Sequence, residues 1–191
     1  MSDLLAQNMY SLGIAKLARA IAELAVSEIS STPESIILSL AFLDSIYSSE
    51  LIVRASILKI ELEENLANLG EGAVSEIRQA ELINGSSRLS FLKLPEELER
   101  ISGKSIINSK VYYEMNHLRK ILLSEEIDPT QLVEPTLRFA FESIEPLIID
   151  IWGEIIALYF PELDFEVDKY IDILLTRYNV TVSQHDLFED D

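Results

Sequence analysis

Cysteine is the residue whose absence says most about this chain of 191 residues, because the sequence contains none. Disulfides, thiolate metal sites and iron–sulfur clusters are therefore excluded within the chain, and a reducing cytosol is the compartment that this composition favours. Histidine is nearly as scarce, and neither His117 nor His185 has a second histidine or a pair of carboxylates at metal-ligand spacing. We expect no catalytic residue, no metal site and no cofactor in this chain.

Glycine and basic residues are also few. The six glycines stand singly, so the sequence has no glycine-rich phosphate loop of the P-loop or Rossmann type. Lysine and arginine number 15 against 33 acidic residues, which gives a net charge of −18 and predicts weak or no direct binding of nucleic acid. One basic patch is a local candidate, with ordinary solvated side chains as its alternative, and it comprises Arg88, Lys93, Lys104 and Lys110.

No hydrophobic run is long enough to span a bilayer. The most apolar stretch covers residues 147–160 and is interrupted by Asp150 and Glu154. The first residues lack a basic segment followed by a clean apolar run, so they do not read as a secretion signal. We expect a cytoplasmic protein with no membrane partner.

Helical periodicity is what the sequence does contain. With 48% hydrophobic and 25% charged residues, the composition is that of a folded globular chain. Apolar residues recur at spacings of three and four, which predicts a mainly α fold. The first half is expected to form helices at about residues 3–29, 32–47, 51–69 and 72–82. Pro33 near the start of the second and Gly70 after the third mark two of these boundaries.

The middle of the chain changes character. The runs RLSFLKL and SIINSKVYY are prone to form short strands, and PEELERI between them predicts a short helix that Pro95 begins. We therefore expect a multi-helix body with a small α/β lobe. The expected parts are a first helical part at 1–85, the lobe at 86–113, a second helical part at 114–180 and an acidic flexible tail at 181–191.

Large apolar side chains are concentrated in the expected lobe, which is short for burying all of them. Aromatic residues are favoured at the centres of protein interfaces, so these side chains are candidates for binding a partner. The alternative is that they form the core of the lobe itself. The set is Phe91, Leu92, Leu94, Tyr112 and Tyr113.

Three stretches carry a family resemblance through their order and spacing over about residues 2 to 145. They are SDLLAQNMYSLGIAKLARAIAE, then ESIILSLAFLDSIYSSELIVRASILKIELEENL, then SFLKL followed by SGKSIINSKVYYEMNHLRKIL. The first is an early helix, the second an apolar helix, a short polar turn and a long helix, and the third a short strand, a strand pair and a helix. In this order they resemble the N-terminal part of the large, regulatory subunit of archaeal and eukaryotic-type DNA primases.

This resemblance implies a scaffold without catalytic activity of its own. In that family the N-terminal part binds the catalytic small subunit as a heterodimer and supports RNA primer synthesis in DNA replication. The family's iron–sulfur domain has no counterpart in a chain without cysteine, so we expect a shortened subunit, a split subunit whose cluster is borne by a separate chain, or a divergent relative. The family also tends to place Glu before Lys in the third helix, where this chain has Lys59 before Glu61.

Two other functions stay open. The first is a replication scaffold similar to the subunits of the GINS helicase assembly, which also combine a helical body with a small β lobe. The second is a helical protein-interaction adaptor with no role in replication.

Overall fold

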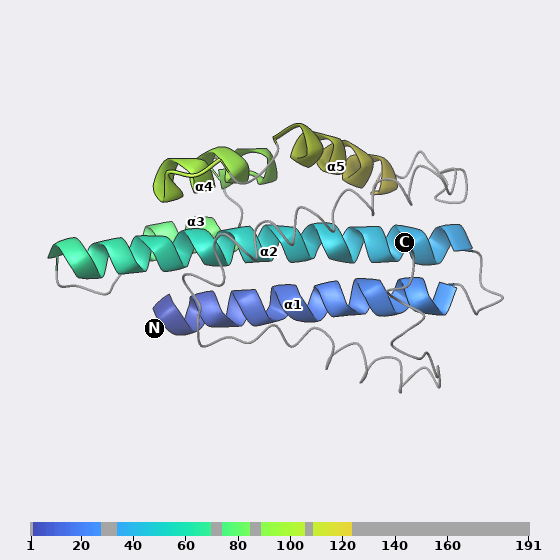
Figure 1. Cartoon of the computed structure of the whole chain (residues 1–191), viewed down its shortest axis with the longest axis horizontal. Coiled ribbons are helices and arrows are strands. Elements are labelled where there is room, and N and C mark those ends of the chain that lie inside the picture. The colour runs from blue at the N-terminus through green and yellow to red at the C-terminus, as the bar shows by residue number, and fades with distance from the viewer. Residues whose placement is uncertain (1, 28–33, 70–73, 85–88, 106–108, 124–191) are drawn as a thin grey trace.

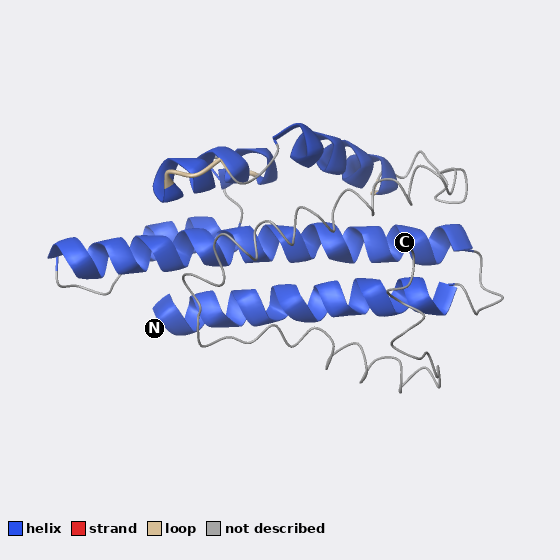
Figure 2. Ribbon diagram, viewed as in Figure 1, coloured by secondary structure: helices blue, strands red, loops and turns tan. Residues whose placement is uncertain are grey.

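The computed structural model describes residues 2–27, 34–69, 74–84, 89–105 and 109–123. Among these residues Figure 2 shows helices and loops and no strand, which confirms the mainly α class. The second helical part beyond residue 123, the acidic tail and Arg88 lie outside the described residues. The elements are α1 (Ser2–Ser27), α2 (Glu34–Leu69), α3 (Glu76–Asn84), the 3-10 turn η2 (Phe91–Lys93), α4 (Leu94–Ser102) and α5 (Ser109–Leu122).

Helices α1 and α2 lie antiparallel and side by side over most of their length (Figure 1). Small side chains along α1 let the two backbones approach, with Ala6, Ala18 and Ala22 all buried. The helices approach closely at Gly13, where an added Cβ would stand 2.8 Å from Cγ1 of Ile52. The carbonyl oxygen of Gly13 also accepts a hydrogen bond of 2.7 Å from the Ser48 hydroxyl. Glycine is therefore required at this position by the distance between the helices.

Helix α2 runs without a break through the polar residues 47–50, where the sequence led us to expect a turn between two helices. That expectation was wrong because the serine hydroxyls find partners without interrupting the helix. Ser45 and Ser49 donate to the carbonyl oxygens of Phe42 and Ile46, three residues earlier, at 2.8 and 2.7 Å. Such back-bonding satisfies the hydroxyl within helical geometry.

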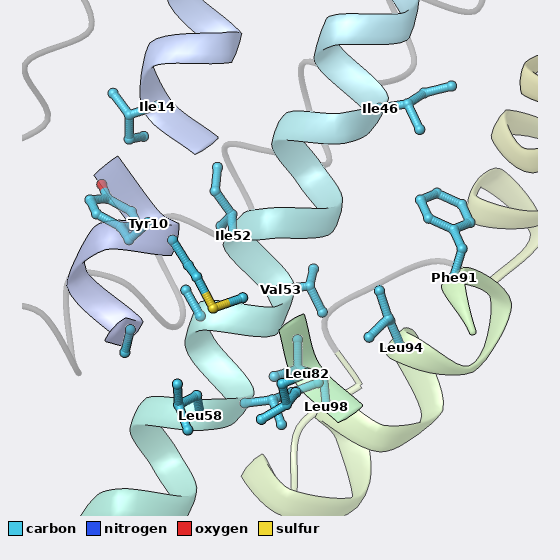
Figure 3. Close-up of a cluster of buried hydrophobic side chains, with 14 of the residues drawn as sticks. Tyr10, Ile14, Ile46, Ile52, Val53, Leu58, Leu82, Phe91, Leu94 and Leu98 are labelled. Atoms are coloured by element: carbon cyan, nitrogen blue, oxygen red, sulfur yellow. The ribbon is translucent and has the colours of Figure 1, made fainter. Parts of the chain in front are cut away.

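The middle of α2 is buried on every side. All residues from Leu51 to Ile60 are buried, including the charged Arg54 and Lys59. Figure 3 shows Tyr10 and Ile14 of α1 on one side of α2, and Phe91 and Leu94 of the later segment on the other. A helix that is apolar all round belongs in the interior of a fold, and α2 is accordingly the element against which α1, α3, α4 and α5 pack.

The short strands expected at 86–113 are absent from the described residues of this segment, which form η2, α4 and the start of α5. The short helix expected after Pro95 is confirmed as α4, with proline in its first turn. It ends at Gly103, which has a φ of 69° and donates its N–H to the Glu99 carbonyl. Phe91 and Tyr112 stack with ring centroids 4.1 Å apart, so these β-prone aromatic residues pair through their rings instead of through strands.

A larger side chain at residue 13 should push α1 away from α2. We predict that Gly13→Val lowers the free energy of unfolding by about 1–3 kcal/mol, because the interface has no room for the added atoms. The control is Ser11→Val on the exposed side of the same helix, which should shift stability by less than about 0.5 kcal/mol. Urea denaturation followed by circular dichroism measures both. Equal stability of the two variants would contradict the close approach.

Candidate functional site

The five apolar residues predicted to bind a partner divide into two groups. Phe91, Leu94 and Tyr112 are buried in the hydrophobic core, and Figure 3 shows Phe91 and Leu94 within its cluster beside α2. Leu92 and Tyr113 are 38% and 65% exposed. Three of these residues therefore lie in a core that they share with α1 and α2 and not in a core of their own, and the remaining two are accessible. A role for Leu92 and Tyr113 in binding a partner stays a prediction.

A buried arginine on α2 holds two later parts of the chain against that helix. Arg54 is 3% exposed. Its guanidinium donates to Glu50 Oε1 from Nε at 3.1 Å and from Nη2 at 2.7 Å. It also donates to the carbonyl oxygens of Leu82 at 3.2 Å and Leu89 at 3.1 Å. These carbonyls stand on either side of residues 85–88, so one guanidinium holds both the end of α3 and the approach to η2 against α2.

Glu50 connects the same junction to α5. Its Oε2 lies 3.5 Å from Nη1 of Arg119, whose Nη2 donates to Asn116 Oδ1 at 3.0 Å. The Arg119 guanidinium lies over the Phe91 ring, 4.7 Å from its centroid, in a cation–π contact. Burial, reinforced by the Glu50 charge, raises the pKa of the nearby Tyr112 phenol. The contacts of Arg54, Glu50 and Arg119 thus join α2 to α3, to the approach to η2 and to α5.

A second arginine joins α3 to α2 and α4. Arg78 donates to Glu61 Oε1 at 2.7 Å from Nη2 and at 3.0 Å from Nε, and it also contacts Glu97. Arg100 pairs with the same Glu97 at 3.0 Å. The hydrogen bond from Arg100, together with Arg78, holds the pKa of the Glu97 carboxyl below its usual range, against the opposing effect of burial. Carboxylates from two helices thus hold α3 by its charged edge.

Lys59 and Glu61, the two residues that depart from the family pattern, have separate partners. Lys59 pairs with Asp3 of α1 at 2.7 Å and with Glu63 at 3.3 Å. Glu61 pairs with Arg78 of α3. One residue therefore ties α2 to α1 and the other ties α2 to α3.

The inner side of α3 carries the buried Leu82 beside Arg78, and other apolar residues of the helix face outward. Ile77 is 76% exposed, Ile83 is 53% exposed, and Ala80 between them is exposed as well. We call Ile77, Ala80 and Ile83 the α3 face. We did not identify it from the sequence, because an apolar stripe at spacing three normally marks the buried side of a helix. The residue in the sequence that could have indicated this orientation is Arg78. Its cationic side chain lies on the opposite edge of α3 and pairs with Glu61 of α2 and Glu97 of α4.

The three residues of the predicted basic patch that the structure describes lie on the surface. Lys93 lies in η2, Lys104 follows α4 and Lys110 lies in the first turn of α5, and all three are exposed. Binding of nucleic acid by this set stays a prediction. The residues that the structure describes contain no group of three His, Cys, Asp or Glu side chains that could hold a metal ion. In the same part of the chain, no helix combines the length and apolar character needed to cross a membrane.

Comparison with known proteins gives no match: no protein-family model, no curated protein and no solved structure matches the chain.

Removing the buried arginine should destabilise the whole junction. We predict that Arg54→Ala lowers the free energy of unfolding by about 3–5 kcal/mol, since it leaves two carbonyl oxygens without this donor and leaves Glu50 with only its longer contact to Arg119. Arg100→Ala is the matched control, because its side chain is 64% exposed and the change should cost less than about 1 kcal/mol. Chemical denaturation of the full chain measures both. A cost for Arg54→Ala as small as that of the control would show that the buried contacts add nothing.

The Glu97 cluster should make stability depend on pH. A carboxyl whose pKa is depressed on folding contributes stability that is present above its unfolded pKa of about 4.3 and is lost as pH falls through the folded value. We therefore predict that Glu97→Gln is less stable than the wild type at neutral pH and that the difference shrinks as pH falls below about 4. The exposed neighbour Glu96→Gln is the control. Thermal melts across this range test the prediction, which fails if the two variants behave alike.

Proposed function

We propose that this chain is a non-catalytic scaffold subunit of a DNA primase, which binds the catalytic small subunit as a heterodimer and supports RNA primer synthesis. The order of the three resembling stretches supports the family. The scaffold role is supported by the buried and half-buried arginines, which hold helices together. Arg54 and Arg78 are both occupied in holding helices against α2.

The observation that carries the proposal is the exposed α3 face. Full burial of an isoleucine side chain contributes about 1.5–3 kcal/mol, and the α3 face presents two of them to solvent. The helix that bears them is held by Arg78 along its inner edge and by Arg54 at the Leu82 carbonyl. A partner would therefore meet a surface that is already ordered, and little conformational entropy would be lost on binding.

The electrostatics favour a basic partner. The chain has a net charge of −18, and Glu76 is exposed beside the α3 face. Complementary charge speeds association and selects among partners with similar apolar surfaces. A catalytic subunit that handles nucleotides and a template strand carries basic groups for that purpose, which makes it a suitable partner for an acidic scaffold.

The test is to mix the full chain with the small primase subunit encoded in the same genome. We expect a stable one-to-one complex in size-exclusion chromatography with light scattering. If the chain remains monomeric in the mixture, the proposed function is wrong. A particle of four chains formed without a primase subunit would also overturn it and would favour a scaffold of the GINS type.

The α3 face can be tested in the same complex. We predict that Ile77→Asp weakens binding of the small subunit about tenfold or more, because it places a charge in an apolar contact. The control is Leu4→Asp, a change of the same kind at a leucine that is 61% exposed on α1. Titration calorimetry should find the control equal to the wild type. Equal affinities of the two variants would exclude the α3 face as the interface.

A further inference from the structure

Helix α3 covers one side of α2 along part of its length only. Four residues of α2 lie on this side, because they follow one another at the heptad interval, close to two helical turns. They are Leu40, Tyr47, Arg54 and Glu61. Helix α3 packs on the second two, since Arg54 donates to the Leu82 carbonyl and Glu61 pairs with Arg78. In Figure 1, α3 accordingly lies beside the half of α2 that ends at Leu69.

The first two residues of this line are open to solvent. Leu40 is 46% exposed and Tyr47 is 45% exposed, whereas Arg54 in the next position is 3% exposed. Since α3 runs antiparallel to α2, its last turn is directed toward Tyr47. The exposed surface at Leu40 and Tyr47 therefore continues the line along α2 that α3 occupies farther on.

Helix α1 borders this surface through Lys16. Its Nζ donates to Asp44 Oδ1 at 2.7 Å and lies 5.2 Å from the centroid of the Tyr47 ring. Leu12 precedes Lys16 by one helical turn, so it lies along the same edge of α1, and it is 48% exposed. We call Leu12, Leu40 and Tyr47 the α1–α2 face. Because Lys16 and Asp44 pair with each other, this face presents mainly apolar groups.

The α3 face alone is small for a stable complex. A stable interface buries about 800 Å² of each partner and involves about 20–30 residues a side. The α3 face consists of three residues, so a stable complex needs more surface close to it. The α1–α2 face meets this need, because α3 packs on the side of α2 that also carries Leu40 and Tyr47. Ile83, in the last turn of α3, is the member of the α3 face directed toward it.

We propose that the α1–α2 face is a second contact for the catalytic small subunit, which lays an apolar helix along α2 beyond the end of α3. This assignment rests on the proposed function, since it adds a surface to the same complex. Leu40 and Tyr47 stand about 10 Å apart along α2, so a large apolar side chain of the partner fits between them. Helix α3, with Leu82 buried on its inner side, shows the kind of segment that this side of α2 accepts.

A second copy of the chain is the competing occupant. The net charge of −18 opposes association of two copies, because like charges repel. A basic subunit meets the opposite field and is attracted by it. Another segment of the same chain is the remaining occupant, and it would hide Tyr47 from solvent before any partner is added.

The first experiment measures binding of the full chain to the small primase subunit by titration calorimetry. Leu12→Asp and Leu40→Asp should each weaken binding about tenfold or more, because each places a charge in an apolar contact. When Leu40→Asp is combined with Ile77→Asp, the two fold-losses should multiply, since the sites lie on separate helices.

The matched control is Leu4→Asp. Leu4 is 61% exposed and lies about two and a half turns before Gly13, which places it on the side of α1 away from α2. Its affinity should equal that of the wild type. If the wild-type chain does not bind the small subunit, the proposed function fails and this second contact fails with it. If the wild type binds and Ile77→Asp weakens binding while Leu12→Asp and Leu40→Asp do not, only the second contact is overturned.

The second experiment needs no substitution and so holds even if a variant fails to fold. Hydroxyl radicals oxidise accessible side chains, and mass spectrometry locates the modified residues. In the wild-type chain, Tyr47 should be modified when the chain is free and should lose this modification in the complex, whereas Leu4 should be modified equally in both.

Three results of these measurements would overturn the proposal. Equal modification of Tyr47 in the free chain and in the complex would show that the small subunit does not cover it. Protection of Tyr47 in the free monomer would show that the chain itself occupies the α1–α2 face. A dimer of the chain alone that Leu40→Asp dissociates would assign the face to a second copy.

Discussion

The described part of this fold depends on one buried cation. Arg54 lies in the middle of α2, where every neighbouring position is buried, and its guanidinium is satisfied by Glu50 and by two backbone carbonyls from later in the chain. A charge in the interior is tolerated when it is paired and hydrogen-bonded in this way. This need for acceptors fixes how the later segments pack on α2, because the carbonyl oxygens of Leu82 and Leu89 must both lie beside the Arg54 guanidinium.

The backbone acceptor of Arg54 on α3 helps to decide which side of α3 faces solvent. With the end of α3 held at Leu82, Arg78 meets Glu61 on α2 and Glu97 on α4, and the charged edge of α3 becomes its inner edge. The apolar edge is then left outside. The α3 face is thus a consequence of where Arg78 finds its carboxylates.

Local signals in the sequence were sufficient to predict that the first half of the chain is helical, but they were insufficient to predict where each helix begins and ends. Pro95 lies in the first turn of α4 as expected, because it acts through its own backbone geometry, whereas the end of the helix at Gly103 was not predicted. The polar residues 47–50 suggested a turn, but Ser48 donates to Gly13, thirty-five residues away, and α2 continues. The aromatic run ending at Tyr113 suggested a strand, but Tyr112 stacks on Phe91 and the segment is helical. In both places a distant partner overrode a local preference.

By itself, the sequence determined the mainly helical class, the acidic character and the lack of any thiol chemistry, since these follow from composition and from spacing along one helix. The tertiary structure alone decided which of Phe91, Leu92, Leu94, Tyr112 and Tyr113 are buried, and which edge of α3 faces solvent. Periodicity shows that a helix has an apolar and a polar side, but it does not show which side meets the core. That choice depends on contacts such as those of Arg54 and Arg78, whose partners lie too far along the chain for any local pattern to reveal.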